Sequence, residues 1–211
     1  MKKEIFTFNL NDITEIAVLC AMAMVLDTFV KIPIGQSGGS LNFSLVPVFV
    51  IALRHGPFKS FIAGGIIYGL TTNLLDGYGI QTYPLEYLVA FGAICILGFF
   101  GPYISRSFKE KNKAKIVISI LLIIFSIAMW GLIRWIAASI DSMLFYEVTF
   151  EGGLAYNALY VLPTAALDAI LVAILAPSIS SMSRRHPSNY LKAYNNKEKT
   201  TADIPNDKQD V

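Results

Sequence analysis

The stretch IVISILLIIFSIAMWGLI, from Ile116 to Ile133, contains no charged residue. A helix needs about 20 consecutive apolar residues to cross the hydrocarbon core of a bilayer, and this stretch approaches that length. Three more uncharged windows occupy residues 41–53, 60–75 and 87–105. Because 55% of the residues are hydrophobic, only 15% are charged and the mean hydropathy is +0.56, the composition is typical of an integral membrane protein and not of a soluble domain.

Breakers between the apolar runs predict six transmembrane helices, so the expected fold class is an all-α integral membrane protein. The breakers are IPIGQSGGS, RHGP, DGYGIQTYP, SRSFKEKNKAK and DSMLFYEVTFEGG. The helices are expected at residues 12–30, 41–54, 58–76, 84–107, 114–140 and 155–181. Together they form one membrane domain over residues 1–182. The polar remainder, residues 183–211, is rich in Asn and Lys without apolar periodicity, which predicts a disordered cytoplasmic tail.

Basic residues near the helix ends are distributed unevenly, and this distribution predicts the orientation of the chain. If the N-terminus and the C-terminus are both cytoplasmic, Lys31 is the only basic residue in the outer connections of the sequence. Those connections instead carry Asp76, Asp141, Glu147 and Glu151. The basic residues on the inside are then Lys2, Lys3, Arg54, Lys59, Arg106, Lys109, Lys111, Lys113, Lys115, Arg184, Arg185 and the lysines of the tail. We therefore expect a multi-pass protein of the cell membrane.

Several function classes find no support in the sequence. A formal net charge of +2, with no basic stripe among aromatic residues, does not indicate nucleic-acid binding. The patterns GxxxxGK[ST], HExxH and GxSxG are absent from the sequence, so ATP hydrolysis by this chain is not expected. Cys20 and Cys95 lie in apolar runs, which favours buried thiols over a disulfide or a metal site. We predict a protein that is not an enzyme and uses no cofactor and no metal.

Two ionisable residues, Glu86 and Arg134, lie inside apolar helices near their outer ends. A bare charge in hydrocarbon costs several kcal/mol, so such residues normally find a partner or a wet cavity. One interpretation is that they pair with each other or extend to the membrane interface. The other is that they line an outward-facing polar pocket, together with other polar and aromatic residues expected at the outer helix ends. Those residues are Asn73, Asp76, Gln81, Tyr83, Tyr156, Asn157 and Tyr160.

Three further features have alternative interpretations. Tyrosines gather at membrane interfaces as well as in binding pockets, so only their combination with polar residues indicates a site. Asp168 lies near the middle of the last helix, where a buried hydrogen-bonded carboxylate and a proton relay are equally compatible with the sequence. Ala17 and Ala21 form an AxxxA pattern that lets another helix approach closely, either within the bundle or from a partner.

Three segments resemble the thiamine-specific S components of energy-coupling factor (ECF) vitamin importers. They are SLVPVFVIALRHG (44–56), IQTYPLEYLVAFGAICILGFFG (80–101) and YNALYVLP (156–163). The resemblance implies a membrane protein that captures a vitamin, thiamine or a thiamine-like compound, from outside the cell. A transmembrane coupling protein and two cytoplasmic ATPase subunits would then drive uptake.

The resemblance also implies roles for individual residues. Ala17 and Ala21 match the alanine motif through which the family's first helix contacts the coupling protein, with Val25 at the next step. Glu86 would accept hydrogen bonds from the aminopyrimidine ring of the ligand, and Asn157 and the neighbouring tyrosines would complete the pocket.

The sequence also departs from the family pattern. The tryptophans that the family places in the first outer loop and near the end of the fifth helix are missing, and Arg134 stands where the family has a histidine. Because thiamine is a cation, a fixed arginine opposes it unless Glu86 or Asp141 neutralises the charge. Two alternatives follow: an S component for another, anionic vitamin held by Arg134, or a small structural or assembly protein of the membrane that binds no ligand.

Overall fold

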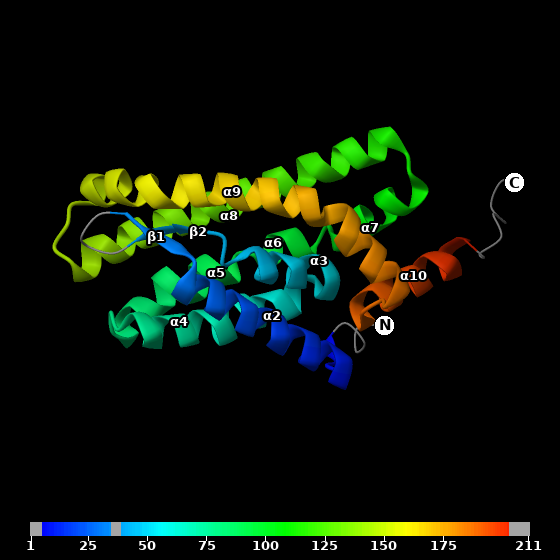
Figure 1. Cartoon of the computed structure of the whole chain (residues 1–211), viewed down its shortest axis with the longest axis horizontal. Helices are drawn as coiled ribbons and strands as arrows, with labels where there is room; N and C mark the ends of the chain where they lie inside the picture. Colours follow the sequence, from blue (N-terminus) through cyan, green and yellow to red (C-terminus); the bar gives the residue numbers. More distant parts are fainter. Residues whose placement is uncertain (1–5, 35–38, 203–211) are drawn as a thin grey trace, which may run out of the picture.

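The computed structural model describes residues 6–34 and 39–202, with the backbone alone for 197–202, and is mostly helical (Figure 1). Lys2, Lys3, Lys208 and part of the loop IPIGQSGGS lie outside the described residues. The elements are α2 (Leu10–Phe29), β1 (Lys31–Pro33), β2 (Ser40–Asn42), α3 (Val46–Phe61), the π-helix η1 (Ile62–Tyr68), α4 (Gly69–Asp76), the 3-10 helix η2 (Ile80–Thr82), the π-helix η3 (Tyr83–Val89), α5 (Ala90–Gly92), α6 (Cys95–Gly98), α7 (Gly101–Glu110), α8 (Lys113–Phe145), α9 (Phe150–Arg185) and α10 (Asn189–Ala202).

The bundle has two ends that differ in the elements they hold (Figure 1). The strands β1 and β2, the end of α4 and the α8–α9 connection lie together at one end, which we call the hairpin end. The first turn of α2, the α7–α8 connection and α10 lie at the opposite end, which we call the α10 end.

Local capping explains where three of the long helices begin. The side chain of Asn9 accepts a hydrogen bond from the Asp12 amide at the start of α2 (2.7 Å). Asn112 does the same at the start of α8, and the Thr149 hydroxyl accepts a hydrogen bond from the Gly152 amide at the start of α9. Such side chains satisfy amides that have no partner in the first helical turn.

The predicted break at RHGP coincides with a change of direction at Gly56. This glycine has φ of 81°, a left-handed conformation that other residues rarely adopt, and Pro57 follows it directly. Close packing adds a second requirement for glycine, because a Cβ atom at this position would lie 2.8 Å from the ring of Tyr190. From there the chain continues as helix to Asp76, where Gly77 ends it with φ of 73°.

A short antiparallel hairpin replaces the expected start of the second helix. Lys31 pairs with Asn42 and Pro33 with Ser40, so β1 and β2 occupy residues that we had assigned to a loop and to a helix beginning at residue 41. The side chain of Asn42 explains the difference, since its amide donates to Asp27 (3.1 Å) and its oxygen accepts from Ser44 (2.9 Å). These contacts hold the chain extended until α3 begins.

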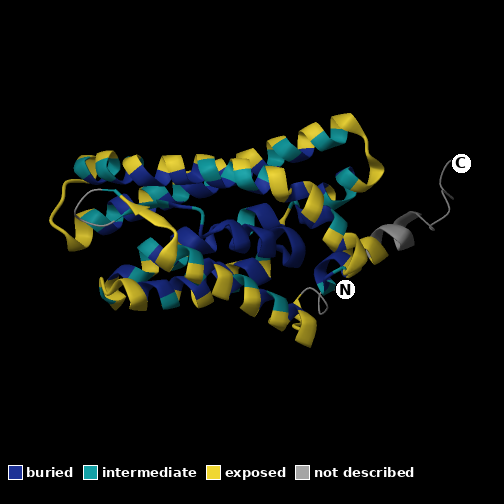
Figure 2. Ribbon diagram, in the orientation of Figure 1, coloured by how far each residue is buried: buried dark blue, intermediate teal, exposed yellow. Residues whose placement is uncertain are grey.

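Three helical segments among the described residues are long and apolar enough to cross a membrane: Ile80–Glu110, Lys113–Phe145 and Phe150–Arg185. The outward faces of α8 and α9 are exposed along much of their length, whereas their inward faces are buried (Figure 2). On α8 the exposed side chains include Leu121 and Phe125, as expected for a surface in contact with lipid.

The core is centred on Trp130 of α8, which is fully buried. Its ring packs edge to face against Phe49 at 5.2 Å between centroids, and its Nε1 donates to the Ala90 carbonyl (2.9 Å). Trp135 donates to the Leu154 carbonyl (2.8 Å) and so joins α8 to α9.

The chain after residue 182 differs from the disordered tail that we expected. α9 continues to Arg185, and α10 packs against the bundle with Tyr190, Leu191 and Ala193 buried. The hydroxyl of Tyr190 donates to the Gly98 carbonyl (3.1 Å), and that of Ser188 donates to the Arg54 carbonyl. Three apolar residues spaced for one helix face in an otherwise polar segment were too weak a signal to indicate this packing.

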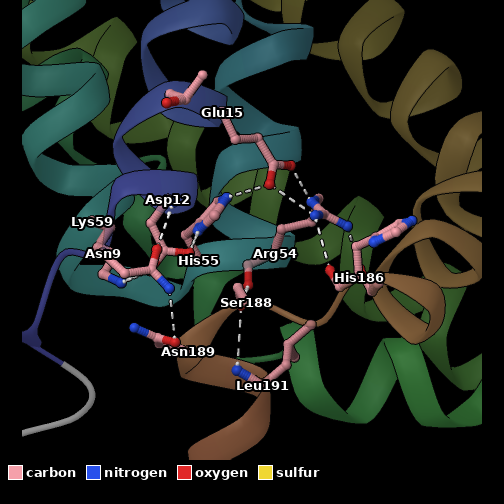
Figure 3. Close-up of polar contacts among 12 residues, drawn as sticks. Asn9, Asp12, Glu15, Arg54, His55, Lys59, His186, Ser188, Asn189 and Leu191 are labelled. Atoms are coloured by element: carbon pink, nitrogen blue, oxygen red, sulfur yellow. Dashed lines mark hydrogen bonds and ion pairs between the residues drawn. The ribbon is translucent and has the colours of Figure 1, made fainter.

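Polar and charged side chains join α2, α3 and the beginning of α10 at the α10 end (Figure 3). Arg54 is buried, pairs with Glu15 of α2 and donates to the His186 carbonyl (3.2 Å). Asn9 donates to the Asn189 side chain (3.1 Å). The beginning and the end of the described chain are therefore held together by one polar network.

Candidate functional site

A cavity of about 660 Å³ lies at the hairpin end of the bundle, among residues from α2, the two strands, α4, η3, α8 and α9. This volume is typical of pockets for small molecules. The lining residues are Asp27, Lys31, Pro33, Gly39, Ser40, Asn42, Thr72, Asp76, Tyr78, Thr82, Glu86, Tyr87, Phe91, Arg134, Asp141, Ser142, Tyr146, Val148, Gly153, Tyr156, Asn157 and Tyr160.

Glu86 and Arg134 line this cavity together, from η3 and α8 respectively. Within residues 6–34 and 39–202, no ion pair of 4.0 Å or less joins the two side chains. The Arg134 guanidinium lies instead over the ring of Phe91, at 5.1 Å from its centroid. The Nε atom of Arg134 is buried without a hydrogen-bond partner.

The wall on α9 is formed by residues at helical spacing. Asn157 is buried and donates to the Ser142 hydroxyl of α8 (3.2 Å), while its oxygen accepts from the Tyr160 hydroxyl (2.7 Å). Tyr156 packs edge to face on Tyr160, with 6.1 Å between ring centroids. Its hydroxyl also donates to the carbonyl of Ile34 (3.4 Å), which connects the wall to the hairpin.

Acidic residues outnumber basic residues in the lining. The carboxylates are Asp27, Asp76, Glu86 and Asp141, and the cations are Lys31 and Arg134. Asp76 accepts a hydrogen bond from the Tyr87 hydroxyl (3.0 Å) and lies 3.9 Å from the Lys31 ammonium group. One oxygen of Asp141 is buried without a partner. The lining therefore contains twice as many carboxyl groups as cationic groups.

The structure brings six of the proposed binding residues to the cavity. They are Asp76, Glu86, Arg134, Tyr156, Asn157 and Tyr160. The others do not line it. Tyr83 donates its hydroxyl to the Gly65 carbonyl (3.0 Å), and Gln81 is exposed with its amide directed to the Tyr78 carbonyl (3.4 Å).

Several residues that line the cavity were not predicted from the sequence. Tyr87 and Phe91 lie on an apolar stretch and are four residues apart, a spacing that is also typical of ordinary core packing. Asn42 and Gly39 come from the first outer connection, where no periodicity marks a face. A Cβ atom at Gly39 would lie 2.6 Å from the Tyr160 ring, so the strand passes directly against this tyrosine.

The two alanines proposed for partner contact lie away from the cavity, on the exposed face of α2. Ala17, Ala21 and Val25 are exposed at intervals of four residues, whereas Ile16, Cys20 and Ala23 of the same helix are buried. The small residues therefore do not pack against the remainder of the bundle.

Comparison with known proteins gives consistent results. Residues 13–184 match the family model described as thiamine transporter protein. The thiamine transporter ThiT of Bacillus subtilis is 31% identical over 176 residues, which cover 76% of this chain and 88% of that protein. ThiT of Lacticaseibacillus paracasei is 29% identical over 109 residues, covering 49% of this chain and 53% of that protein.

A solved structure has the same fold. ThiT from Listeria monocytogenes superposes with a TM-score of 0.68 at 24% sequence identity, and the match covers 81% of this chain and 97% of that one.

Proposed function

This chain belongs to the thiamine transporter protein family, and from this premise we propose that it is the substrate-binding S component of an ECF-type importer. In this role it binds thiamine or a close analogue in the cavity at the hairpin end. The relatives are transporters and not enzymes. ATP-driven uptake then depends on partner proteins, because no nucleotide-binding pattern is present in the sequence.

The observation that carries the substrate assignment is the chemistry of the cavity lining. Thiamine joins an aminopyrimidine to a positively charged thiazolium ring, so it needs hydrogen-bonding groups, aromatic surfaces and a negative environment. Glu86 and Asn157 supply polar groups, and Tyr156 and Tyr160 supply aromatic faces. The excess of carboxylates over cations in the lining favours a cation over an anion.

Partner contact is assigned to the exposed face of α2. A helix that is exposed at Ala17 and Ala21 can approach another helix closely, because these side chains end at Cβ. We assign this face to the transmembrane coupling protein, which in turn binds two cytoplasmic ATPase subunits. At the next step of the alanine motif, this face carries Val25 in place of an alanine.

Arg134 is the specific observation in favour of a second candidate, an S component for an anionic vitamin. An arginine in the lining can form two parallel hydrogen bonds with a carboxylate or a phosphate group. This candidate predicts that an anionic ligand binds more tightly than thiamine and that Arg134→Gln abolishes its binding.

A thermal-shift assay on the purified protein in detergent tests both candidates, with thiamine, thiamine phosphates and other water-soluble vitamins as ligands. A ligand at about 100 times its dissociation constant stabilises the folded state by roughly 2.7 kcal/mol. A shift with thiamine supports the proposal, and a shift only with an anion supports the second candidate. The absence of any shift would favour a membrane structural protein without a ligand.

A further inference from the structure

Asp168 of α9 is a fully buried carboxylate, and neither of its oxygens has a hydrogen-bond partner. Burying an ionisable group without partners is costly, so such a residue in a membrane helix indicates a role beyond packing. The helix α8, which packs along α9, carries a buried cation, Arg134. Arg134 is itself nine-tenths buried, and its Nε has no partner.

The register of α8 and α9 brings these two side chains toward the same level of the bundle. The helices are antiparallel, since Asn157 contacts Ser139 while a Cβ atom on Gly131 would lie 3.0 Å from that of Ala165. Side chains on a helix lean toward its N-terminus. Gly131 and Ala165 lie at the same level of the bundle. Arg134 leans toward this level from one side and Asp168 from the other, so the two side chains lean toward each other.

The two side chains do not form an ion pair in this structure. The guanidinium carbon of Arg134 lies 5.6 Å from the Trp130 ring centroid and 5.9 Å from that of Tyr160, and the residue lines the cavity. Asp168 does not line the cavity, and no ion pair of 4.0 Å or less joins it to Arg134 among the described residues. A shift of the guanidinium out of the cavity, toward the level of Gly131 and Ala165, would bring it toward the carboxylate.

We propose that Asp168 is the counter-ion of Arg134 and makes the cavity selective for a cationic ligand by holding the guanidinium when the ligand's positive charge enters. Asp168 touches no ligand and acts through Arg134, so it is a positioning residue. The inference rests on the proposed function, because it takes thiamine as the cation. It also explains how an arginine can line the binding site of a cation.

The test compares thiamine with its neutral isostere, in which a thiophene ring replaces the thiazolium, by titration calorimetry on the purified full chain. Asp168→Asn leaves the Arg134 charge free to lie nearer the ligand, and at an effective dielectric constant of about 20 one unit charge about 10 Å away changes the affinity by roughly tenfold. We expect Asp168→Asn to weaken thiamine binding by about this factor and to change binding of the isostere less than about twofold. A purely structural role would weaken both ligands equally, and this result would overturn the proposal.

A double-mutant cycle tests whether Asp168 acts through Arg134. In an Arg134→Gln background, Asp168→Asn should no longer change the ratio of the two affinities, and an unchanged effect would contradict the proposal. If Asp168→Asn does not fold, Asp168→Glu replaces it: retained preference for the cation supports the proposal, and loss of that preference overturns it. Failure of the unmodified protein to bind thiamine would instead refute the proposed function.

Discussion

The ammonium group of Lys59 lies 2.6 Å from Oδ2 of Asp12, and the two side chains are 0% and 3% exposed. His55 lies beside this pair, with Nδ1 3.4 Å from Asp12 and Nε2 3.2 Å from Glu15 (Figure 3). Arg54 completes the network by pairing with Glu15. Buried charges of this kind stabilise a fold only while each has its partner.

Lys59→Met should therefore destabilise the protein strongly, because it leaves Asp12 buried without its closest cation. Removal of one partner of a buried ion pair costs about 3–5 kcal/mol. The measurement is thermal unfolding in detergent without ligand, with the exposed Lys192→Met as the matched control. The double variant Asp12→Leu/Lys59→Met should recover part of the loss, and equal unfolding temperatures for Lys59→Met and Lys192→Met would contradict the role of the pair.

Glu86→Gln should lower the affinity for thiamine. A hydrogen bond to a charged group contributes about 1.5–3 kcal/mol, which corresponds to roughly 10- to 100-fold in the dissociation constant. Titration calorimetry measures the effect, and Glu147→Gln, an exposed carboxylate outside the cavity lining, is the control. If both variants bind thiamine as tightly as the original chain, Glu86 is not a ligand contact.

Ala21→Trp should prevent assembly with the coupling protein and leave thiamine binding intact, because an indole on the exposed face of α2 keeps a partner helix at a distance. Co-purification with the coupling protein measures assembly. The control is Ile174→Trp on α9, which places the same bulk at an equally apolar position that is 67% exposed. Normal co-purification of the Ala21 variant would exclude this face as the docking surface.

The orientation of the chain can be measured by cysteine labelling in intact cells with a membrane-impermeant maleimide. In a background without Cys20 and Cys95, Glu147→Cys in the α8–α9 connection should be labelled. Lys111→Cys in the α7–α8 connection should be protected until the cells are opened, because basic connections remain in the cytoplasm. The reverse pattern would invert the proposed topology.

Tyr190→Ala should lower the stability of the ligand-free protein, which would show that α10 is part of the folded unit. The Tyr190 side chain is buried and donates a hydrogen bond to Gly98. Burial raises the pKa of its hydroxyl to about 12, so the group remains a donor at neutral pH. Replacing a buried aromatic residue by alanine costs about 3–5 kcal/mol.

Tyr194→Ala is the matched control, because Tyr194 lies one helical turn further along α10 and is 40% exposed. Thermal unfolding of the two variants gives the comparison. If the two variants unfold at the same temperature, α10 does not contribute to the stability of the fold. That result would favour the disordered tail that the composition predicts.

The class of the protein and the positions of most helices could be predicted from sequence because they depend on local composition. A segment that crosses a bilayer must satisfy its own backbone and present apolar side chains, so the windows around Ile116–Ile133 indicate helices without reference to other residues. The break at Gly56 is equally local, since a glycine followed by proline interrupts a helix in most surroundings.

Only the tertiary structure decided which polar residues meet. Tyr83 and Tyr87 belong to the same short stretch, yet Tyr87 lines the cavity while Tyr83 hydrogen-bonds to Gly65. The stretch is a π-helix, so the usual period of 3.6 residues does not predict which side chains share a face.

Helix rotation and register also determine how Arg134 lies relative to Asp168. The same is true of the packing of α10 against α3, because these helices are far apart in sequence. Sequence therefore determined the membrane fold and the residue types available to the site. Packing between helices determined the site itself, because contacts across a bundle depend on the orientation of every helix that contributes to them.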